Sequence, residues 1–150
     1  MRSFDAFTEI PFEQLVESEK KGIIDSRRVH KRKPDGSARS RLACRGFTEV
    51  IESRDDVYGA TPTFSTLKLI LSRALNNSYS MCVGDASTAF LHTNVIQPTF
   101  VMPPDDYQPD SKEKVVWKLQ KAMYGLKSAP KSWQEHIRDC LLYTSQSPRD

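Results

Sequence analysis

The sequence predicts an α+β domain with a largely antiparallel sheet and packed helices, on three observations. Short runs that alternate apolar and polar residues, typical of strands, are interspersed with two longer runs of helical period. These runs do not follow the regular strand–helix–strand spacing of a parallel α/β fold. A Pro-Asp-Gly turn joins two of the expected strands as a hairpin. With 150 residues, the chain is long enough for about one such domain.

The first expected elements are a short helix and a hairpin. Residues 1–19 are an acidic, mildly amphipathic lead-in, and residues 11–22 (PFEQLVESEKKG) predict a short helix that begins within it. Residues 22–50 predict two strands around the turn KPDGS. Ile24 belongs to the first strand and Cys44 to the second. The many basic residues of this region are therefore expected on an exposed hairpin.

The best helix signal is the run YGATPTFSTLKLILSRALNN, residues 58–77. Thr61 is expected to cap this helix, and Pro62 suits its first position. Asn76 and Asn77 are expected to end it. Apolar residues recur along it at three- and four-residue steps, namely Phe64, Leu67, Ile70, Leu71, Ala74 and Leu75.

A strand is expected next, and it would deliver Asp85. Tyr79, Met81 and Val83 alternate with smaller or more polar residues, which indicates a strand. Asp85 follows directly and could cap a helix or form an Asx turn. It could also bind a ligand, because the four small residues 86–89 leave room before the next aromatic side chain.

Two further strands and a helix complete the expected elements. Residues 100–102 predict a short strand before a Pro-rich loop, and residues 115–119 predict another, in which Val115, Trp117 and Leu119 share one face. The final helix would open at Pro130. Its apolar stripe comprises Trp133, Ile137 and Leu141.

Charge is distributed unevenly along the chain. Lys20–Arg54 holds eleven Lys/Arg and four Asp/Glu, a net charge of +7, whereas the remainder carries −4. A basic block on a slightly acidic body fits a contact with phosphates, although a solvated charged face is the simpler alternative. The three cysteines are widely spaced and predict neither disulfides nor a zinc site. With no signal peptide or membrane span, the expected location is intracellular, cytoplasmic or nuclear.

Four motifs occur in order along the chain, namely RSRLACRGF, DASTAFLHT, FVMPPDDY and VVWKLQKAMYGLKSAPKSW. Together they resemble the reverse transcriptase domain of Ty1/copia-type retrotransposons. The resemblance covers roughly residues 24–141. It implies a right-hand polymerase, with fingers at residues 20–78, the start of the palm at 79–141, and a tail outside the family pattern at 142–150.

The resemblance implies a catalytic site around Asp85. Asp85 matches the first catalytic aspartate, which binds Mg²⁺, and the backbone carbonyl of Ala86 would help to hold the second ion. Hard cations of this kind take oxygen ligands. Phe90 matches the aromatic residue that closes the sugar pocket and selects deoxynucleotides; the alternative is a core aromatic residue.

The resemblance also implies nucleotide and nucleic-acid contacts. Arg39 and Arg41 match the basic pair that binds the incoming triphosphate, with Arg41 the stronger candidate. Template or general phosphate contacts are expected from three other basic residues, Lys31, Arg32 and Arg45. Residues that match the loop lining the nucleotide and template pocket are Tyr124, Gly125 and Lys127. The implied partners are an RNA template, a DNA primer, dNTP and the other parts of a retrotransposon polyprotein, without a membrane.

The second carboxylate pair of the family, a YVDD-like motif after the YGLK box, has no match here. Asp55-Asp56 precedes Asp85, and Asp105-Asp106 precedes the YGLK box, so both are interpreted as loop acids. The resemblance thus implies an incomplete RNA-directed DNA polymerase that is inactive alone. The alternative is a noncatalytic module that binds nucleic acid through the basic hairpin Lys20–Arg54. A functionless product of a degenerate element also stays open.

Overall fold

The computed structural model of the chain describes residues 4–51, 57, 59–109 and 113–146. Its centre is one five-stranded sheet with the strand order β1-β5-β4-β2-β3. The strands are β1 (Phe7–Pro11), β2 (Ile24–Arg32), β3 (Ala38–Cys44), β4 (Phe100–Met102) and β5 (Val115–Leu119). The helices are α1 (Glu17–Lys21), α2 (Phe64–Asn76) and α3 (Ala129–Gln146). The predicted α+β class is confirmed.

The sheet is mixed, with one parallel pair among antiparallel ones. β1 pairs with β5, β5 with β4, and β2 with β3, all antiparallel. The parallel contact joins β2 to β4 and places Ile24 beside Val101. β1 was not expected, because the sequence analysis placed only a short helix in the lead-in. β1 lies at the edge of the sheet and ends in Pro11, a residue suited to an edge because it has no N–H to donate.

The core lies where β5 crosses the centre of the molecule. Trp117 stacks on Phe7 at a ring-centroid distance of 4.2 Å and meets the Tyr107 ring edge-on at 4.9 Å. Val116, on the opposite face of β5, is also fully buried, against Leu15. The lead-in therefore covers the second face of the sheet, which the alternation of β5 alone did not predict.

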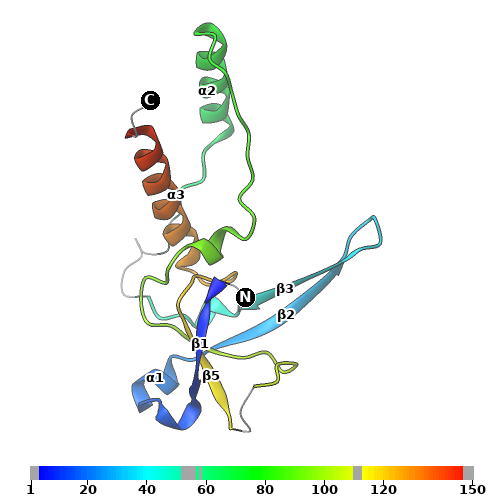
Figure 1. Cartoon of the computed structure of the whole chain (residues 1–150), viewed down its shortest axis with the longest axis vertical. Coiled ribbons are helices and arrows are strands. Elements are labelled where there is room, and N and C mark those ends of the chain that lie inside the picture. Colours follow the sequence, from blue (N-terminus) through cyan, green and yellow to red (C-terminus); the bar gives the residue numbers. More distant parts are fainter. Residues whose placement is uncertain (1–3, 52–56, 58, 110–112, 147–150) are drawn as a thin grey trace.

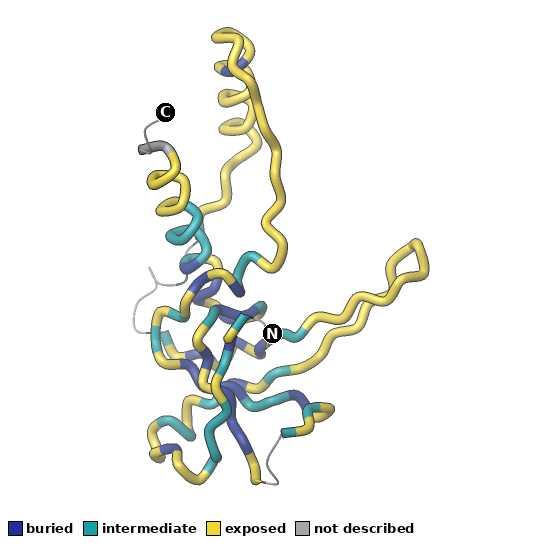
Figure 2. The backbone as a smooth tube through the Cα atoms, in the orientation of Figure 1, coloured by how far each residue is buried: buried dark blue, intermediate teal, exposed yellow. Residues whose placement is uncertain are grey.

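The β2–β3 hairpin forms as predicted. Its two strands pair from Ser26–Cys44 to Arg32–Ala38, and Asp35 closes the turn by accepting hydrogen bonds from the backbone and side chain of Ser37. These bonds lower the pKa of the Asp35 carboxyl. Beyond its base the hairpin is exposed and projects from the body as an arm (Figures 1 and 2).

The expected strand over residues 79–83 is wrong. Residues 79–86 have no regular structure, and Val83 is 96% exposed. Alternating apolar residues form a strand only where a neighbouring strand satisfies their backbone groups, and no strand described by the structure lies beside this segment. Asp85 therefore does not stand at the end of a buried strand.

The helix α2 forms, but its cap and its packing differ from expectation. The side chain of Thr63, rather than Thr61, accepts the capping hydrogen bond, from the backbone N–H of Thr66. The helix begins at Phe64, two residues after Pro62. Figure 2 shows α2 exposed almost throughout, and Phe64 is 71% exposed. The expectation of packed helices thus fails for α2, because no described segment covers its apolar stripe.

The thiol of Cys44 couples the stability of this fold to pH. Burial raises the pKa of the Cys44 thiol to about 12, and the negative charge of Glu49 adds to this effect. The folded chain thus keeps a proton that the unfolded chain loses near pH 9. Below pH 9 both states keep the proton, so the stabilising effect of the buried thiol is fully present. Above pH 9 we expect the free energy of unfolding to fall by at most about 1.4 kcal/mol per pH unit.

Urea unfolding of wild type and Cys44→Ala between pH 8 and 11 measures this contribution. In Cys44→Ala the free energy of unfolding should fall less steeply with pH than in wild type. Cys82→Ala, which removes an exposed thiol, should show the same pH dependence as wild type. Equal slopes in Cys44→Ala and wild type would contradict this linkage.

Candidate functional site

A pocket of about 270 Å³ opens at the base of the hairpin arm, where several predicted site residues meet. Three parts of the chain contribute to it: strand β3, the 3-10 helix Ala89–His92 with the turn before it, and the segment that follows β5. The lining residues are Arg39, Ser40, Arg41, Leu42, Thr88, Leu91, Met123 and Tyr124. Two of them are arginines and none is acidic, so the pocket suits an anionic ligand.

The register of the hairpin gathers cations on one face. Arg39 and Arg41 are two residues apart in β3, so their side chains leave the same face. Lys31 lies directly opposite Arg39 across the ladder. Like charges in such a pair destabilise a sheet, and a bound anion removes that cost. The pairing therefore favours a phosphate-bearing ligand on this face.

Tyr124 lines the pocket together with the arginines. The Arg41 guanidinium lies 5.7 Å from the centroid of the Tyr124 ring, a cation–π contact. On its other side Tyr124 meets Phe90 edge-on, with ring centroids 4.9 Å apart. Phe90 belongs to the 3-10 helix Ala89–His92. The structure thus brings Arg39, Arg41, Phe90 and Tyr124 together.

Gly125 lets two backbones cross beside this pocket. Its φ is +92°, and a Cβ there would lie 2.1 Å from the carbonyl oxygen of Cys44. The Cys44 N–H donates to the Tyr124 carbonyl at 2.7 Å across the same crossing. Gly46 is equally confined, because a Cβ on it would meet the Gly125 carbonyl at 2.1 Å. Gly125 therefore allows the two backbones to approach closely.

Lys127 is bound to protein carbonyls rather than to the pocket. Its amine donates to the carbonyl oxygens of Phe47 at 2.9 Å and Glu49 at 3.1 Å. The buried Glu49 carboxylate in turn accepts from the Lys127 backbone N–H at 2.5 Å and from the Ser128 hydroxyl at 2.6 Å. Neither Glu49 nor Ser128 was among the predicted site residues. Glu49 stands two residues after the RGF motif and is the acid nearest to that motif, but no local pattern marks it as buried.

Asp85 and Ala86 lie exposed in the irregular segment before the pocket. Among the residues that the structure describes, no three histidine, cysteine or acidic side chains group closely enough to hold a metal ion. Asp85 alone does not make a Mg²⁺ site, because such ions need several oxygen ligands. The described residues therefore do not fit the implied pair of metal ions.

One of the two Asp-Asp pairs lies within the part of the chain that the structure describes. Asp105 and Asp106 are exposed in a turn after β4, and the Asp106 carboxylate pairs with the Arg28 guanidinium at 2.8 Å. The expectation that they are loop acids is confirmed. Asp55-Asp56 lies outside the described residues.

The remaining predicted phosphate contacts are exposed along the hairpin and at its base. Lys31 and Arg32 end β2, next to the turn, and both are exposed. Arg45 follows β3, and its guanidinium lies 3.9 Å from the Asp25 carboxylate. These three residues do not line the pocket, but Lys31 shares the face of Arg39.

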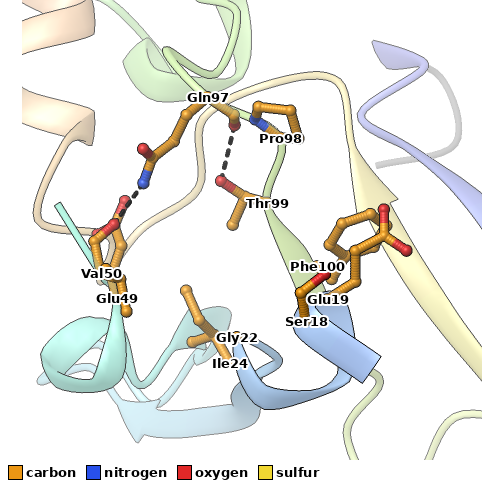
Figure 3. Close-up of a pocket in the computed structure, with 10 residues that line it drawn as sticks. All are labelled: Ser18, Glu19, Gly22, Ile24, Glu49, Val50, Gln97, Pro98, Thr99 and Phe100. Carbon is orange, nitrogen blue, oxygen red and sulfur yellow. Dashed lines mark hydrogen bonds between the residues drawn. The ribbon is translucent and has the colours of Figure 1, made fainter. Parts of the chain in front are cut away.

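A second pocket, of about 440 Å³, lies between α1 and β4 (Figure 3). Its polar groups include the Gln97 amide, which donates to the Val50 carbonyl, and the Thr99 hydroxyl, which donates to the Gln97 carbonyl at 2.9 Å. The charged side chains that line it, Glu19 and Glu49, are both acidic. This lining repels a phosphate, whereas the first pocket, lined by Arg39 and Arg41 and called the basic pocket, attracts one.

Comparison with known proteins agrees with the motifs. Residues 13–149 match the family described as Reverse transcriptase (RNA-dependent DNA polymerase). This match extends into the segments that the sequence analysis treated as lead-in and tail. No solved structure matches the chain significantly. Among the helices that the structure describes, none combines the length and apolarity that crossing a bilayer requires.

Curated relatives include the Ty1-BL, Ty1-NL2 and Ty1-DR5 transposon Gag-Pol polyproteins of Saccharomyces cerevisiae (strain ATCC 204508 / S288c). Each is 29% identical over 127 residues, which is 84% of this chain. The chain spans only 7% of the length of these relatives. The family match over most of the chain nevertheless shows its membership. The chain belongs to the reverse transcriptase (RNA-dependent DNA polymerase) family, as part of a Ty1/copia-type retrotransposon reverse transcriptase.

Proposed function

We propose that this chain forms the fingers and the first part of the palm of an RNA-directed DNA polymerase, and that the basic pocket binds the incoming dNTP. The observation that carries the proposal is the meeting of Arg39, Arg41 and Tyr124 around a pocket whose lining contains no acid. Arginine forks match phosphate oxygens, and an aromatic face suits a base or a sugar. Phe90, packed edge-on against Tyr124, is the proposed sugar gate.

The hairpin arm is the proposed contact for the nucleic-acid backbone. Lys31 and Arg32 near its tip, and Arg45 at its base, would bind phosphates of the RNA template and the DNA primer. Because these side chains are exposed, their contribution would fall steeply with salt. The relatives are Gag-Pol polyproteins, so further partners would be the other parts of such a polyprotein.

Asp85 is the proposed first catalytic aspartate, and the described residues do not complete a metal site around it. We therefore expect these 150 residues to give no primer extension on an RNA template with dNTP and Mg²⁺. A longer product of the same reading frame that adds a YxDD hairpin should be active, and Asp85→Ala should abolish that activity. Extension by the 150-residue chain that is lost in Asp85→Ala would contradict the proposed incompleteness.

The alternative is a noncatalytic module that binds nucleic acid through the hairpin, and the net charge of +7 over Lys20–Arg54 favours it. Two equilibrium titrations of the same chain separate the readings, one with dATP and one with an RNA–DNA hybrid. The polymerase proposal expects both ligands to bind, with Arg41→Ala weakening dATP binding. Hybrid binding without dATP binding would favour the module.

A further inference from the structure

The buried carboxylate of Glu49 lies outside the basic pocket yet connects the two chain segments that form its walls. Glu49 is 5% exposed and follows the 3-10 helix Gly46–Thr48, which itself follows strand β3. Its two oxygens accept hydrogen bonds from Lys127 and Ser128, which are 78 and 79 positions away in the sequence. Tyr124 stands three residues before Lys127. The carboxylate thus ties the arginine-bearing strand to the turn that carries the tyrosine.

Two further contacts strengthen this connection. The Lys127 amine returns to the same segment, where it donates to the carbonyls of Phe47 and Glu49. In addition, the Gln97 amide donates to the carbonyl of Val50, and Figure 3 shows this bond beside Glu49. Segment 46–50 is therefore held by two separate parts of the chain, and neither set of contacts uses a residue that lines the basic pocket.

We infer that Glu49 is a positioning residue for the nucleotide pocket. Its hydrogen bonds hold the turn that carries Tyr124, and so they keep the Tyr124 ring against the Arg41 guanidinium. The inference rests on the proposed function, and it assigns Lys127 to the contacts that hold Glu49 instead of to the lining of the nucleotide and template pocket. Hydrogen bonds to a buried carboxylate are short and directional, so losing them would free the turn to move. The Arg41–Tyr124 distance of 5.7 Å leaves little tolerance for such movement, because cation–π attraction extends to about 6 Å.

Replacement of Glu49 by glutamine and by alanine gives a graded test. In Glu49→Gln the amide oxygen still accepts from the Lys127 N–H, and the amide nitrogen donates to the Ser128 hydroxyl, which can reverse its role. In Glu49→Ala both bonds are lost. Ser128→Ala removes one bond only, and it serves if Glu49→Ala does not fold. Glu13→Ala, which removes an exposed glutamate outside the pocket, is the matched control.

Two readouts are needed, because a purely structural role would also lower stability. The first is the equilibrium dissociation constant for dATP. The second is the ¹⁹F resonance of Tyr124 in chain labelled with 3-fluorotyrosine, which contains five tyrosines and can be assigned with Tyr124→Phe. The resonance reports the surroundings of Tyr124 in the folded chain without ligand, and it is independent of the melting temperature.

We expect Glu49→Ala to shift the Tyr124 resonance and weaken dATP binding about tenfold, with a smaller effect in Ser128→Ala. Glu49→Gln should restore both readouts, and Glu13→Ala should change neither. A lower melting temperature with an unchanged resonance and unchanged affinity in Glu49→Ala and Ser128→Ala would overturn the inference. If wild type binds no dATP but the Tyr124 resonance still depends on Glu49, the positioning of Tyr124 by Glu49 is supported and the nucleotide pocket itself is refuted.

Discussion

Replacing Gly125 with alanine is expected to be the most destabilising single change near the pocket. The new Cβ would lie 2.1 Å from the Cys44 carbonyl oxygen, and the backbone φ of +92° is unfavourable for any residue with a side chain. Relief requires the two backbones to separate, which breaks the hydrogen bond from the Cys44 N–H to the Tyr124 carbonyl. Strain and overpacking together should cost about 4 kcal/mol.

Two other glycines provide the controls. Gly36 also has a positive φ, +80°, but no atom lies within 4 Å of the added Cβ, so Gly36→Ala should cost about 1–2 kcal/mol from strain alone. Gly84 is open as well and has no positive φ, so Gly84→Ala should be nearly neutral. Urea unfolding of the three variants measures their losses in the free energy of unfolding, which should be largest for Gly125→Ala and smallest for Gly84→Ala. A cost for Gly125→Ala no greater than that for Gly36→Ala would show that the chain crossing is not tight.

Removal of the Arg41 guanidinium should have the largest effect on nucleotide binding. Arg41 lines the pocket and lies over Tyr124, so Arg41→Ala removes both a phosphate fork and the cation–π contact. Charge-assisted hydrogen bonds contribute about 1.5–3 kcal/mol, so the dATP dissociation constant should rise roughly 10- to 100-fold. The dissociation constant of Arg41→Lys should lie between those of wild type and Arg41→Ala, because lysine keeps the charge and loses the planar fork.

The matched control is Arg28→Ala, on the same hairpin. It also removes one positive charge. Arg28, however, lies on the face of the hairpin opposite to Arg39 and Arg41, and it pairs with Asp106. Its effect on dATP binding should be less than about threefold, since exposed ion pairs contribute little. If Arg28→Ala and Arg41→Ala weaken binding equally, the arm attracts anions by net charge alone and the pocket has no specific role.

Local signals in the sequence were enough for several elements. The Pro-Asp-Gly turn predicted the hairpin, and Asp35 closes that turn with bonds to its near neighbour Ser37. The three- and four-residue spacing predicted α2, although two nearby threonines made the capping residue ambiguous, and Thr63 caps instead of Thr61. These features depend on residues a few positions apart, so they can be read without the tertiary structure.

Features that depend on distant partners were not predictable in this way. Tyr79, Met81 and Val83 alternate as in a strand, but alternation does not supply the neighbouring strand that a ladder needs. Strand β1 was not predicted, because it is defined by its pairing with β5, a segment more than 100 positions away in the sequence. In the candidate site, the structure places Arg39, Arg41 and Tyr124 around one pocket and Phe90 against Tyr124, and their roles stay a prediction. Glu49 became visible only through its contacts with the distant 127–128 segment.

The assignment of Asp85 and of the division into fingers and palm stays a prediction. Asp85 is exposed in a segment without regular structure, and the described residues provide it with no partner ligands for a metal ion. The family membership supports its catalytic role, and primer extension by a longer product of the reading frame tests that role directly. The nucleotide pocket, in contrast, can be tested in the 150-residue chain.

Photo-cross-linking with 8-azido-dATP, followed by peptide mapping, tests the central claim most directly. If the basic pocket binds dNTP, adducts should fall within residues 38–44, 88–92 or 123–127, and excess dATP should suppress them. Arg41→Ala should reduce their yield, whereas Arg28→Ala should not. Adducts confined to the acidic pocket between α1 and β4, or adducts that excess dATP does not suppress, would contradict the assignment of the basic pocket as the nucleotide site.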